Sequence, residues 1–265
     1  MSSSSPSGRL LVDEPAPGVT RLTISHPGKR GALDHAILDA FASMMPQLDA
    51  RCVIITGEES TFSAGYDISD LPEEVFADEA EKLIAHPFAA AIDAIAAYRY
   101  PTVAALNGHA IGGGLELALA CDLRIAAGSI ALAMPPAKLA LVYSHTGIHK
   151  FVEIVGAART RELFLVGRRI DARTARAWGL VNAVAEDGRL AEEALELAQE
   201  IAANAPLALV GNKRVIQAVT SVQGTLDPDT ERELIELRRA CFSSADFREG
   251  VRAFAEKRPP QWKGR

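Results

Sequence analysis

Cysteine is scarce in this chain of 265 residues, and long apolar runs are absent. The three cysteines, Cys52, Cys121 and Cys241, are far apart and odd in number, so they fit neither a disulfide framework nor a Cys-x-x-Cys zinc site. Each has apolar neighbours, which favours buried packing. Because no stretch reaches the roughly 18 apolar residues that a membrane-spanning helix needs, we expect no membrane partner.

A secretory signal and a basic surface are also missing. The first residues are rich in serine and contain no apolar stretch, so we expect residues 1–8 to be a disordered tail rather than a signal peptide. Acidic side chains outnumber basic ones by 34 to 28, and no lysine or arginine run is long enough for a nucleic-acid surface. We therefore expect a cytoplasmic protein with no nucleic-acid partner.

Segments with strand and helix patterns alternate along most of the chain. Strand patterns lie at 19–25, 52–56, 102–106, 123–126 and 181–184, and helix patterns at 32–48, 79–98, 113–120, 148–155, 160–166, 174–178 and 244–257. This alternation predicts right-handed crossovers and an α/β sheet. The later chain reads as helices separated by Pro206, Gly224 and Pro228. We expect a core domain at 9–204 and a helical region at 205–265.

Two short glycine-bearing turns give the strongest functional signal. Ser63-Ala64-Gly65-Tyr66-Asp67 follows an apolar run at 51–57, and Gly112-Gly113-Gly114-Leu115-Glu116 follows another at 101–108. Each pattern predicts a buried strand, a tight turn and the first turn of a helix, whose first N–H groups have no internal acceptor. Glycine lets a ligand oxygen approach the backbone closely. Two such ends facing each other would form an oxyanion hole, where each donor contributes about 3–4 kcal/mol in acyl-transfer enzymes.

Simpler interpretations of these residues stay open. Glycines also permit close packing, although these do not form the G-x-G-x-x-G pattern of a dinucleotide site. Glu116 either acts in the site or only complements the helix dipole, and Asp67 either acts or caps its helix. His145 and His149 lie four residues apart, but they lack the intervening glutamate of an H-E-x-x-H motif and an evident third ligand. We therefore expect no metal site.

In this order and context, the two turns resemble the signature of the crotonase superfamily, the enoyl-CoA hydratase/isomerase fold. The resemblance covers the chain after residue 10. It is carried by Arg30-Gly31-Ala32-Leu33-Asp34, Phe62-Ser63-Ala64-Gly65-Tyr66-Asp67-Ile68 and Asn107-Gly108-His109-Ala110-Ile111-Gly112-Gly113-Gly114-Leu115-Glu116. It implies an α/β spiral of repeated ββα units with a C-terminal helical trimerisation region, and a homotrimer or dimer of trimers.

The resemblance also implies roles for single residues. The oxyanion donors would be the backbone N–H groups of Tyr66 and Gly113. We expect coenzyme A to arrive as part of an acyl-CoA thioester substrate, with no separate cofactor. The expected coenzyme A-binding residues are Arg30, Ala32, Ala64, Gly65, Tyr66, Asp67, Ile68, Gly113, Pro135 and Lys257. For Lys257, a position near a coenzyme A phosphate and a solvated helix end are both open.

One departure from the family pattern is informative. Hydratases of this family use two glutamates to position and deprotonate a water molecule. Glu116 matches the first, whereas the second normally follows a proline in a Gln-Pro-Glu segment that here reads Met134-Pro135-Pro136. Pro136 therefore occupies the position of the second acid. One carboxylate cannot easily perform both halves of an acid–base addition of water.

Within the superfamily, the chain looks closest to the methylmalonyl-CoA decarboxylases. The matching segments are 63–68, 136–143, 147–149, 238–240 and 254–258. Those relatives also have a proline in place of the second glutamate. They carry histidine where this chain has Tyr66 and threonine where it has Pro135, which leaves the identity of the carboxylated substrate open.

Decarboxylation also suits the predicted site chemically. Loss of CO₂ from a malonyl thioester leaves an enolate on the thioester oxygen, which two N–H donors stabilise without a general base. Tyr143 either holds the departing carboxylate, delivers a proton to the enolate or is only a buried tyrosine. We expect a lyase whose catalytic residues are Tyr66, Gly113, Glu116 and Tyr143. An enoyl-CoA hydratase or isomerase and a non-catalytic coenzyme A-binding protein are the alternatives.

Overall fold

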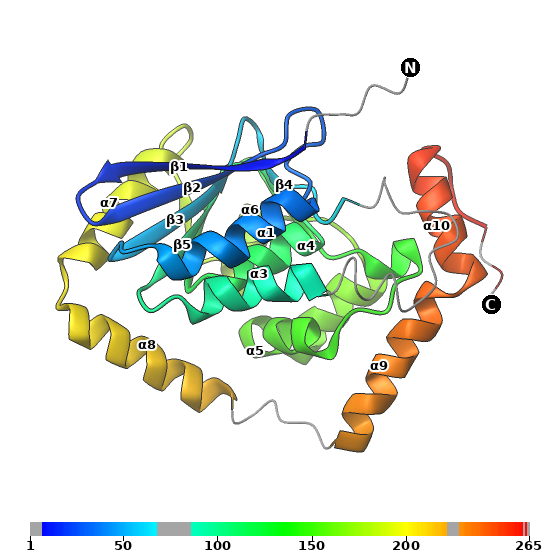
Figure 1. The fold of residues 1–265 in the computed structure, drawn as a ribbon. Helices are drawn as coiled ribbons and strands as arrows, with labels where there is room; N and C mark the ends of the chain where they lie inside the picture. The colour runs from blue at the N-terminus through cyan, green and yellow to red at the C-terminus, as the bar shows by residue number, and fades with distance from the viewer. Residues whose placement is uncertain (1–6, 68–85, 222–227, 262, 264–265) are drawn as a thin grey trace.

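Two β-sheets form the centre of the protein (Figure 1). The computed structural model describes residues 7–67, 86–221, 228–261 and 263. The larger sheet contains, in spatial order, β1 (Arg9–Ala16), β2 (Val19–Ser25), β3 (Cys52–Gly57), β5 (Thr102–Leu106), β7 (Leu123–Ala127) and β10 (Ala183–Ala185). The smaller sheet contains β4 (Thr61–Ser63), β6 (His109–Ile111), β8 (Ala131–Ala133) and β9 (Ile170–Asp171).

Successive chain segments contribute alternately to the two sheets. β3, β5 and β7 are neighbours in the larger sheet, and the strands that follow them, β4, β6 and β8, are neighbours in the smaller sheet. These pairings are parallel, whereas β1 pairs with β2 and β8 pairs with β9 in antiparallel fashion. The predicted spiral of ββα units is therefore confirmed.

Helices cover the sheets and continue beyond them. They are α1 (His35–Met44), α3 (His86–Ala97), α4 (Gly113–Ala120), α5 (His145–Arg161), α6 (Ala172–Trp178), α7 (Leu190–Ala203), α8 (Pro206–Ser221), α9 (Pro228–Phe242) and α10 (Ala245–Ala255). Short 3₁₀ segments lie at η1 (Met45–Gln47) and η3 (Pro136–Leu139), and one π-helical segment at η4 (Glu162–Val166).

The central strands of the larger sheet are buried on both faces, which explains why they are continuously apolar. Ile54 and Val103 belong to a cluster formed with the inner side of α7, whereas Ile55 and Ala104 belong to the main cluster with α1, α3 and α4. The pleat of a strand sends successive side chains to opposite faces. The continuous apolar runs that predicted β3 and β5 therefore arise because these strands face a hydrophobic core on each side of the sheet.

The structure corrects several predicted boundaries. The helix predicted at 32–48 begins at His35 because Asp34 caps it by accepting from the Ile37 N–H at 3.0 Å. The helices predicted at 148–155 and 160–166 form one longer helix, α5, interrupted at Gly156 (φ 77°) and followed by the π-helical segment. The strand predicted at 181–184 is β10 at 183–185. Of the helix predicted at 79–98, residues 79–85 lie outside the described residues.

The C-terminal helices extend away from the sheets (Figure 1). The buried ammonium of Lys213 on α8 donates to Asp122 Oδ2 at 2.7 Å and to the Tyr100 carbonyl at 3.0 Å. At the other end, α10 packs on η3, and an added Cβ on Gly250 would lie 2.7 Å from the Leu139 carbonyl oxygen. In the described part of the chain, no helix combines the length and apolar character needed to cross a membrane.

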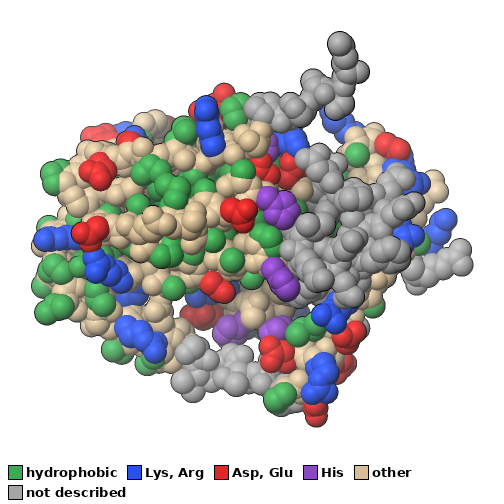
Figure 2. Space-filling model, in the orientation of Figure 1, with side chains coloured by type: hydrophobic (Ala, Val, Ile, Leu, Met, Phe, Trp, Pro, Cys, Tyr) green, Lys and Arg blue, Asp and Glu red, His purple; other side chains and the backbone are tan. Residues whose placement is uncertain are grey.

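Charges of both signs are interspersed on the face of the molecule shown in Figure 2. Lysine and arginine side chains alternate there with acidic ones and form no continuous basic stripe. This surface agrees with the excess of acidic residues in the sequence.

Candidate active site

The two glycine-bearing turns predicted from the sequence lie against each other. An added Cβ on Gly65 would lie 3.3 Å from the Gly113 nitrogen, and one on Gly113 would lie 3.4 Å from the Tyr66 nitrogen. Gly65 itself has φ 98°, and its Cβ would also approach the Ile111 carbonyl oxygen to 2.7 Å, so only glycine fits there. The turns therefore bring the nitrogens of Tyr66 and Gly113, the two expected donors, to one junction.

Gly113 is the first residue of α4, and the preceding Gly112 has the non-helical values φ 56° and ψ −125°. The N–H at this position has no acceptor within its own helix. It also lies at the positive end of the helix dipole. Both features suit stabilisation of a negatively charged oxygen.

Ser63 connects the parts of this junction. Its hydroxyl is fully buried, donates to the Gly31 carbonyl at 2.8 Å and accepts from the Gly65 N–H at 3.1 Å. The start of α4 packs directly on it, because an added Cβ on Gly114 would lie 2.6 Å from Ser63 Cβ. One side chain thus contacts both turns and the loop beside them.

The loop at residues 29–34 is joined to the first turn by backbone hydrogen bonds. Ala64 N–H donates to Arg30 O at 3.0 Å, Leu33 N–H to Gly65 O at 2.8 Å, and Asp67 N–H to Leu33 O at 3.0 Å. Lys29 adds an ion pair to Asp67 at 2.6 Å. The predicted coenzyme A-binding residues Arg30, Ala32, Ala64, Gly65, Tyr66, Asp67 and Gly113 therefore belong to one contiguous region.

The side chain of Tyr66 contacts the start of α1. Its hydroxyl lies 3.3 Å from His35 Nε2, and the two rings meet edge to face. Burial, followed by the nearby carboxylates of Asp67, Asp34 and Asp39, raises the pKa of Tyr66 to about 12. The phenol is therefore neutral at physiological pH, so the residue brings no negative charge to its own N–H donor.

Glu116 and Tyr143 form the second part of the candidate site. Glu116 is buried on the first turn of α4, and the Tyr143 hydroxyl donates to its Oε2. Desolvation raises the pKa of Glu116 to about 7, against the lowering effect of the Tyr143 hydrogen bond. Burial, and then the Glu116 charge, holds the pKa of Tyr143 well above its ordinary value. Near neutral pH the pair can therefore hold or release one proton.

The start of α5 holds this pair in position. Ser144 caps α5 by accepting from the Gly147 N–H at 3.0 Å, and an added Cβ on Gly147 would lie 2.7 Å from Glu116 Oε1. The Tyr143 ring packs edge to face on Phe164, with ring centroids 5.5 Å apart. The first turns of two helices, α4 and α5, therefore enclose the carboxyl group.

Pro136 is the buried first residue of η3, at the position expected for a second acid. Its neighbour Pro135, predicted to bind coenzyme A, packs against Gly167, whose added Cβ would lie 3.1 Å from Pro135 Cα. Among the described residues, no cluster of three or more histidine, cysteine, aspartate or glutamate side chains has the arrangement of a metal site. Glu116 therefore has the Tyr143 phenol, and not a second carboxylate at position 136, as its partner.

Lys257, a further predicted site residue, lies near the other end of the chain. Lys257 is an exposed residue just after α10, and its N–H donates to Phe254 O at 3.2 Å. Within the described residues, no hydrogen bond or ion pair joins Lys257 to the two turns. Ile68 lies outside the described residues, as does any helix that follows Asp67.

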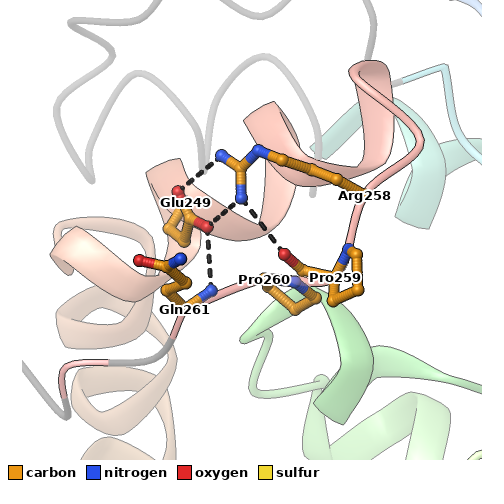
Figure 3. A pocket seen from close by; sticks show the side chains of 5 residues that line it. All are labelled: Glu249, Arg258, Pro259, Pro260 and Gln261. Atoms are coloured by element: carbon orange, nitrogen blue, oxygen red, sulfur yellow. Dashed lines mark hydrogen bonds and ion pairs between the residues drawn. The ribbon is translucent and has the colours of Figure 1, made fainter.

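A separate cavity of about 400 Å³ lies near the C-terminus and is lined by Glu249, Arg258, Pro259, Pro260 and Gln261 (Figure 3). Its charged groups bind each other. Both Glu249 oxygens accept from the Arg258 guanidinium, at 2.6 and 3.0 Å, and one also accepts from the Gln261 N–H at 2.8 Å. The Arg258 hydrogen bond is the main reason that the pKa of Glu249 falls to about 2. We assign this cavity no role in the proposed chemistry.

Ser63, His35 and Phe88 take part in the site although no role was predicted for them from the sequence. Ser63 was part of the recognised motif, but its acceptor Gly31 is distant in sequence. His35 follows the loop at 29–34, and no motif in the sequence singled it out. Phe88 contacts Gly113 across two helices, a contact that no local pattern reveals.

Comparisons with known proteins agree with this geometry. A model of the enoyl-CoA hydratase/isomerase family matches residues 14–265. The carnitinyl-CoA dehydratase of Salmonella typhi is 35% identical over 254 residues, which cover 93% of this chain and 95% of that protein.

Two solved structures are also similar to this chain. A methylmalonyl-CoA decarboxylase superposes with a TM-score of 0.86 at 27% identity, covering 97% of this chain and 98% of that one. An enoyl-CoA hydratase/isomerase from Pseudoalteromonas atlantica T6c superposes with a TM-score of 0.81 at 31% identity, covering 96% and 99%. The relatives thus carry names for decarboxylation, hydration and dehydration.

Proposed function

The chain belongs to the enoyl-CoA hydratase/isomerase family of the crotonase superfamily, and we propose that this acyl-CoA enzyme decarboxylates a malonyl-type, methylmalonyl-like thioester. The observation that carries the proposal is Pro136, which stands where hydration needs a second carboxylate. The two turns that bring the Tyr66 and Gly113 nitrogens together supply what decarboxylation needs most.

In the first step, the thioester oxygen accepts from the N–H groups of Tyr66 and Gly113. The bond from the α-carbon to the carboxylate lies perpendicular to the thioester plane and breaks. Its electron pair enters the carbonyl system, CO₂ leaves, and the negative charge moves to the oxygen between the two donors. The donors interact more strongly with this enolate than with the neutral thioester, and that difference lowers the barrier.

In the second step, the enolate takes one proton at the α-carbon and becomes a saturated thioester. We assign this proton to the Glu116–Tyr143 pair. With its pKa near 7, buried Glu116 is partly protonated at neutral pH and can supply a proton through the Tyr143 hydroxyl. A protonated Glu116 also avoids repelling the carboxylate of the substrate.

Hydration or dehydration is the second candidate, favoured by the 35% identity to carnitinyl-CoA dehydratases and by Glu116 itself. The addition of water would then depend on one carboxyl group that is already hydrogen-bonded to Tyr143. A coenzyme A-binding protein without activity is the third candidate, and the two assembled turns with a titratable acid beside them argue against it.

One experiment separates the three candidates. The protein is incubated with malonyl-, methylmalonyl-, ethylmalonyl- and crotonyl-CoA while CO₂ release and hydration are followed. We expect CO₂ release from at least one malonyl-type thioester and feeble hydration of crotonyl-CoA. Efficient hydration without CO₂ release would overturn the proposal in favour of a hydratase. Calorimetric binding of an acyl-CoA without any turnover would point to a binding protein.

We also propose that the chain forms a homotrimer or a dimer of trimers through its C-terminal helices. On α8, Leu207, Val215, Ile216 and Val219 are 89%, 61%, 63% and 63% exposed, a large apolar surface for a single chain. Light scattering should report a trimer or hexamer, and Ile216→Asp should shift it towards smaller species. A wild-type monomer at micromolar concentration would contradict this proposal.

Two further expectations from the sequence stay predictions. Coenzyme A enters as part of the substrate, so purified protein should need no added cofactor for turnover. The protein is expected in the cytoplasm, which cell fractionation would test.

A further inference from the structure

Phe88 lies on the first turn of α3 and meets the start of α4. It is half-buried and packs against the main core cluster. Figure 1 shows α3 and α4 next to each other, and the two helices are in contact. Phe88 therefore reaches the region of the donor turns from an element that contributes none of the proposed catalytic groups.

The ring of Phe88 approaches the oxyanion junction by its edge. Its Cε2 and Cζ atoms lie 3.1 and 3.3 Å from the position that a Cβ on Gly113 would occupy, and the Tyr66 nitrogen lies 3.4 Å from the same position. Three groups thus converge there: one aromatic edge and the two residues to whose N–H groups the proposed function assigns the thioester oxygen.

This convergence limits the space available to the acyl group. The α-carbon of a bound thioester is two bonds from the oxygen held by the donors, so its substituents must lie close to the same junction. The Glu116–Tyr143 pair is enclosed by the first turns of α4 and α5, whereas Phe88 approaches the junction from α3. An α-substituent therefore has to fit beside the Phe88 ring.

We propose that Phe88 is a specificity-determining residue that forms a wall of the acyl site and restricts the α-substituent to a small group such as methyl. This inference rests on the proposed function only in placing the thioester oxygen at the two donors. It narrows the proposed substrate to malonyl thioesters with a small α-substituent.

Binding of unreactive saturated thioesters tests the proposal without any reaction. Propionyl-, isobutyryl- and 2-ethylbutyryl-CoA present progressively larger α-substitution, and free coenzyme A provides the baseline. For the wild-type protein we expect calorimetry to show at least about tenfold weaker binding of 2-ethylbutyryl-CoA than of isobutyryl-CoA, because even single methylene groups change affinity by such factors in tight apolar sites.

Phe88→Ala should remove most of this discrimination, and Phe88→Leu should remove part of it, while affinity for free coenzyme A stays unchanged. Ile92→Ala is the matched control, because Ile92 lies one turn along α3 and is also half-buried against the core. Ile92→Ala should keep the wild-type ratio of the affinities for isobutyryl-CoA and 2-ethylbutyryl-CoA.

The outcomes separate this inference from a purely structural role for Phe88. A support role would weaken the binding of all three thioesters equally in folded Phe88→Leu and leave their ratio unchanged, which overturns the proposal. An unchanged ratio in folded Phe88→Ala overturns it as well. Failure of the proposed decarboxylation would appear instead as absence of CO₂ release by the wild-type protein, with the binding ratios intact.

Discussion

The candidate site has two halves, one formed by backbone groups and the other by side chains. The oxyanion junction consists of backbone atoms from two turns that pack against each other. Several hydrogen bonds join the first of these turns to the loop at 29–34. The other half, to which we assign the proton transfer, consists of two side chains, Glu116 and Tyr143, joined by a hydrogen bond in a buried setting. In the proposed function, the backbone half suits any reaction through a thioester enolate, whereas the side-chain half decides which reaction follows.

This difference explains why relatives with different names share so much structure. Backbone donors depend on the course of the chain, which the decarboxylase and hydratase relatives reproduce with TM-scores of 0.86 and 0.81. Under the proposed function, proline in place of a second glutamate at position 136 alters the chemistry without altering that course. Substitutions in the backbone half should therefore affect every activity of this chain, and those in the side-chain half should affect the proton step.

Gly113→Pro should have the largest effect. Proline is tolerated in the first position of a helix, so α4 can persist, but the N–H donor is lost and ring atoms take its place. We expect kcat to fall by about 10³-fold or more. Steady-state CO₂ release measures the loss, and circular dichroism checks the fold. Gly113→Ala keeps the donor and should lose less; equal losses in the two variants would mean that packing against Phe88, not the donor, is responsible.

Glu116→Gln should reveal the cost of burying a carboxylate. With a pKa raised from 4.5 to about 7, ionised Glu116 is disfavoured in the folded state. Wild-type stability should therefore fall as pH rises from 4.5 to 7, by up to about 3 kcal/mol from this group, and remain reduced above 7. The glutamine variant lacks this loss, so its stability relative to the wild type should increase over the same interval.

Urea unfolding at pH 5 and pH 8 measures the free energy of unfolding of the wild type and of Glu116→Gln on either side of this change. Glu249→Gln provides the control, because the pKa of Glu249 is lowered from 4.5 to about 2. Its contribution to the stability of the folded state is therefore lost only as the pH falls from about 4.5 towards 2. The difference between that variant and the wild type should be the same at both pH values. If Glu116→Gln behaved in the same way, its carboxyl group would not be the titrating acid that the proposed second step requires.

Tyr143→Phe should slow turnover by about 10–100-fold, because the hydroxyl relays a proton to the enolate. The loss should appear in kcat more than in KM. Tyr98→Phe offers a matched control, because the hydroxyl of buried Tyr98 also donates a hydrogen bond, to Ala50 O at 2.6 Å. Neither residue belongs to the proposed site. Tyr98→Phe should lower stability and leave kcat unchanged. Full kcat in Tyr143→Phe would remove the tyrosine from the proton path.

The backbone half of the site was readable from the sequence because its requirement is local. Gly65 and Gly113 occur next to apolar strands, and close approach of two backbones leaves glycine as the residue that fits. β3 and β5 were readable because burial on both faces makes a strand continuously apolar. These features need only a few neighbouring residues.

Other features depend on distant partners and gave no such signal. β4, β6 and β8 have three residues each, too few to show a strand period. β1 contains Asp13 and a register shift before Ala16, which obscure its alternation. The roles of Ser63 and Phe88 depend on contacts with Gly31 and Gly113, which only the folded chain brings near.

Ser63→Ala should have the smallest effect on turnover and test how the backbone half is held together. The change removes a buried hydroxyl and leaves the Gly31 carbonyl and the Gly65 N–H without that partner. We expect a stability loss of about 1–3 kcal/mol from the unmade hydrogen bonds. Because Gly65 immediately precedes the Tyr66 donor, we also expect a fall in kcat of roughly tenfold, well below the loss from deleting a donor outright.

Ser43→Ala is the matched control, since the Ser43 hydroxyl is exposed and donates only to Ala40 O at 3.3 Å within α1. It should change stability by less than about 0.5 kcal/mol and leave kcat unchanged. The carbonyl stretching frequency of a bound, ¹³C-labelled thioester adds a direct measure of polarisation by the two donors. Ser63→Ala should shift it towards the value in water. A variant that loses stability but keeps both kcat and this frequency would show that the donor turns hold their geometry without the serine, and that the rigidity of the backbone half comes from the hydrogen bonds to the loop at 29–34 alone.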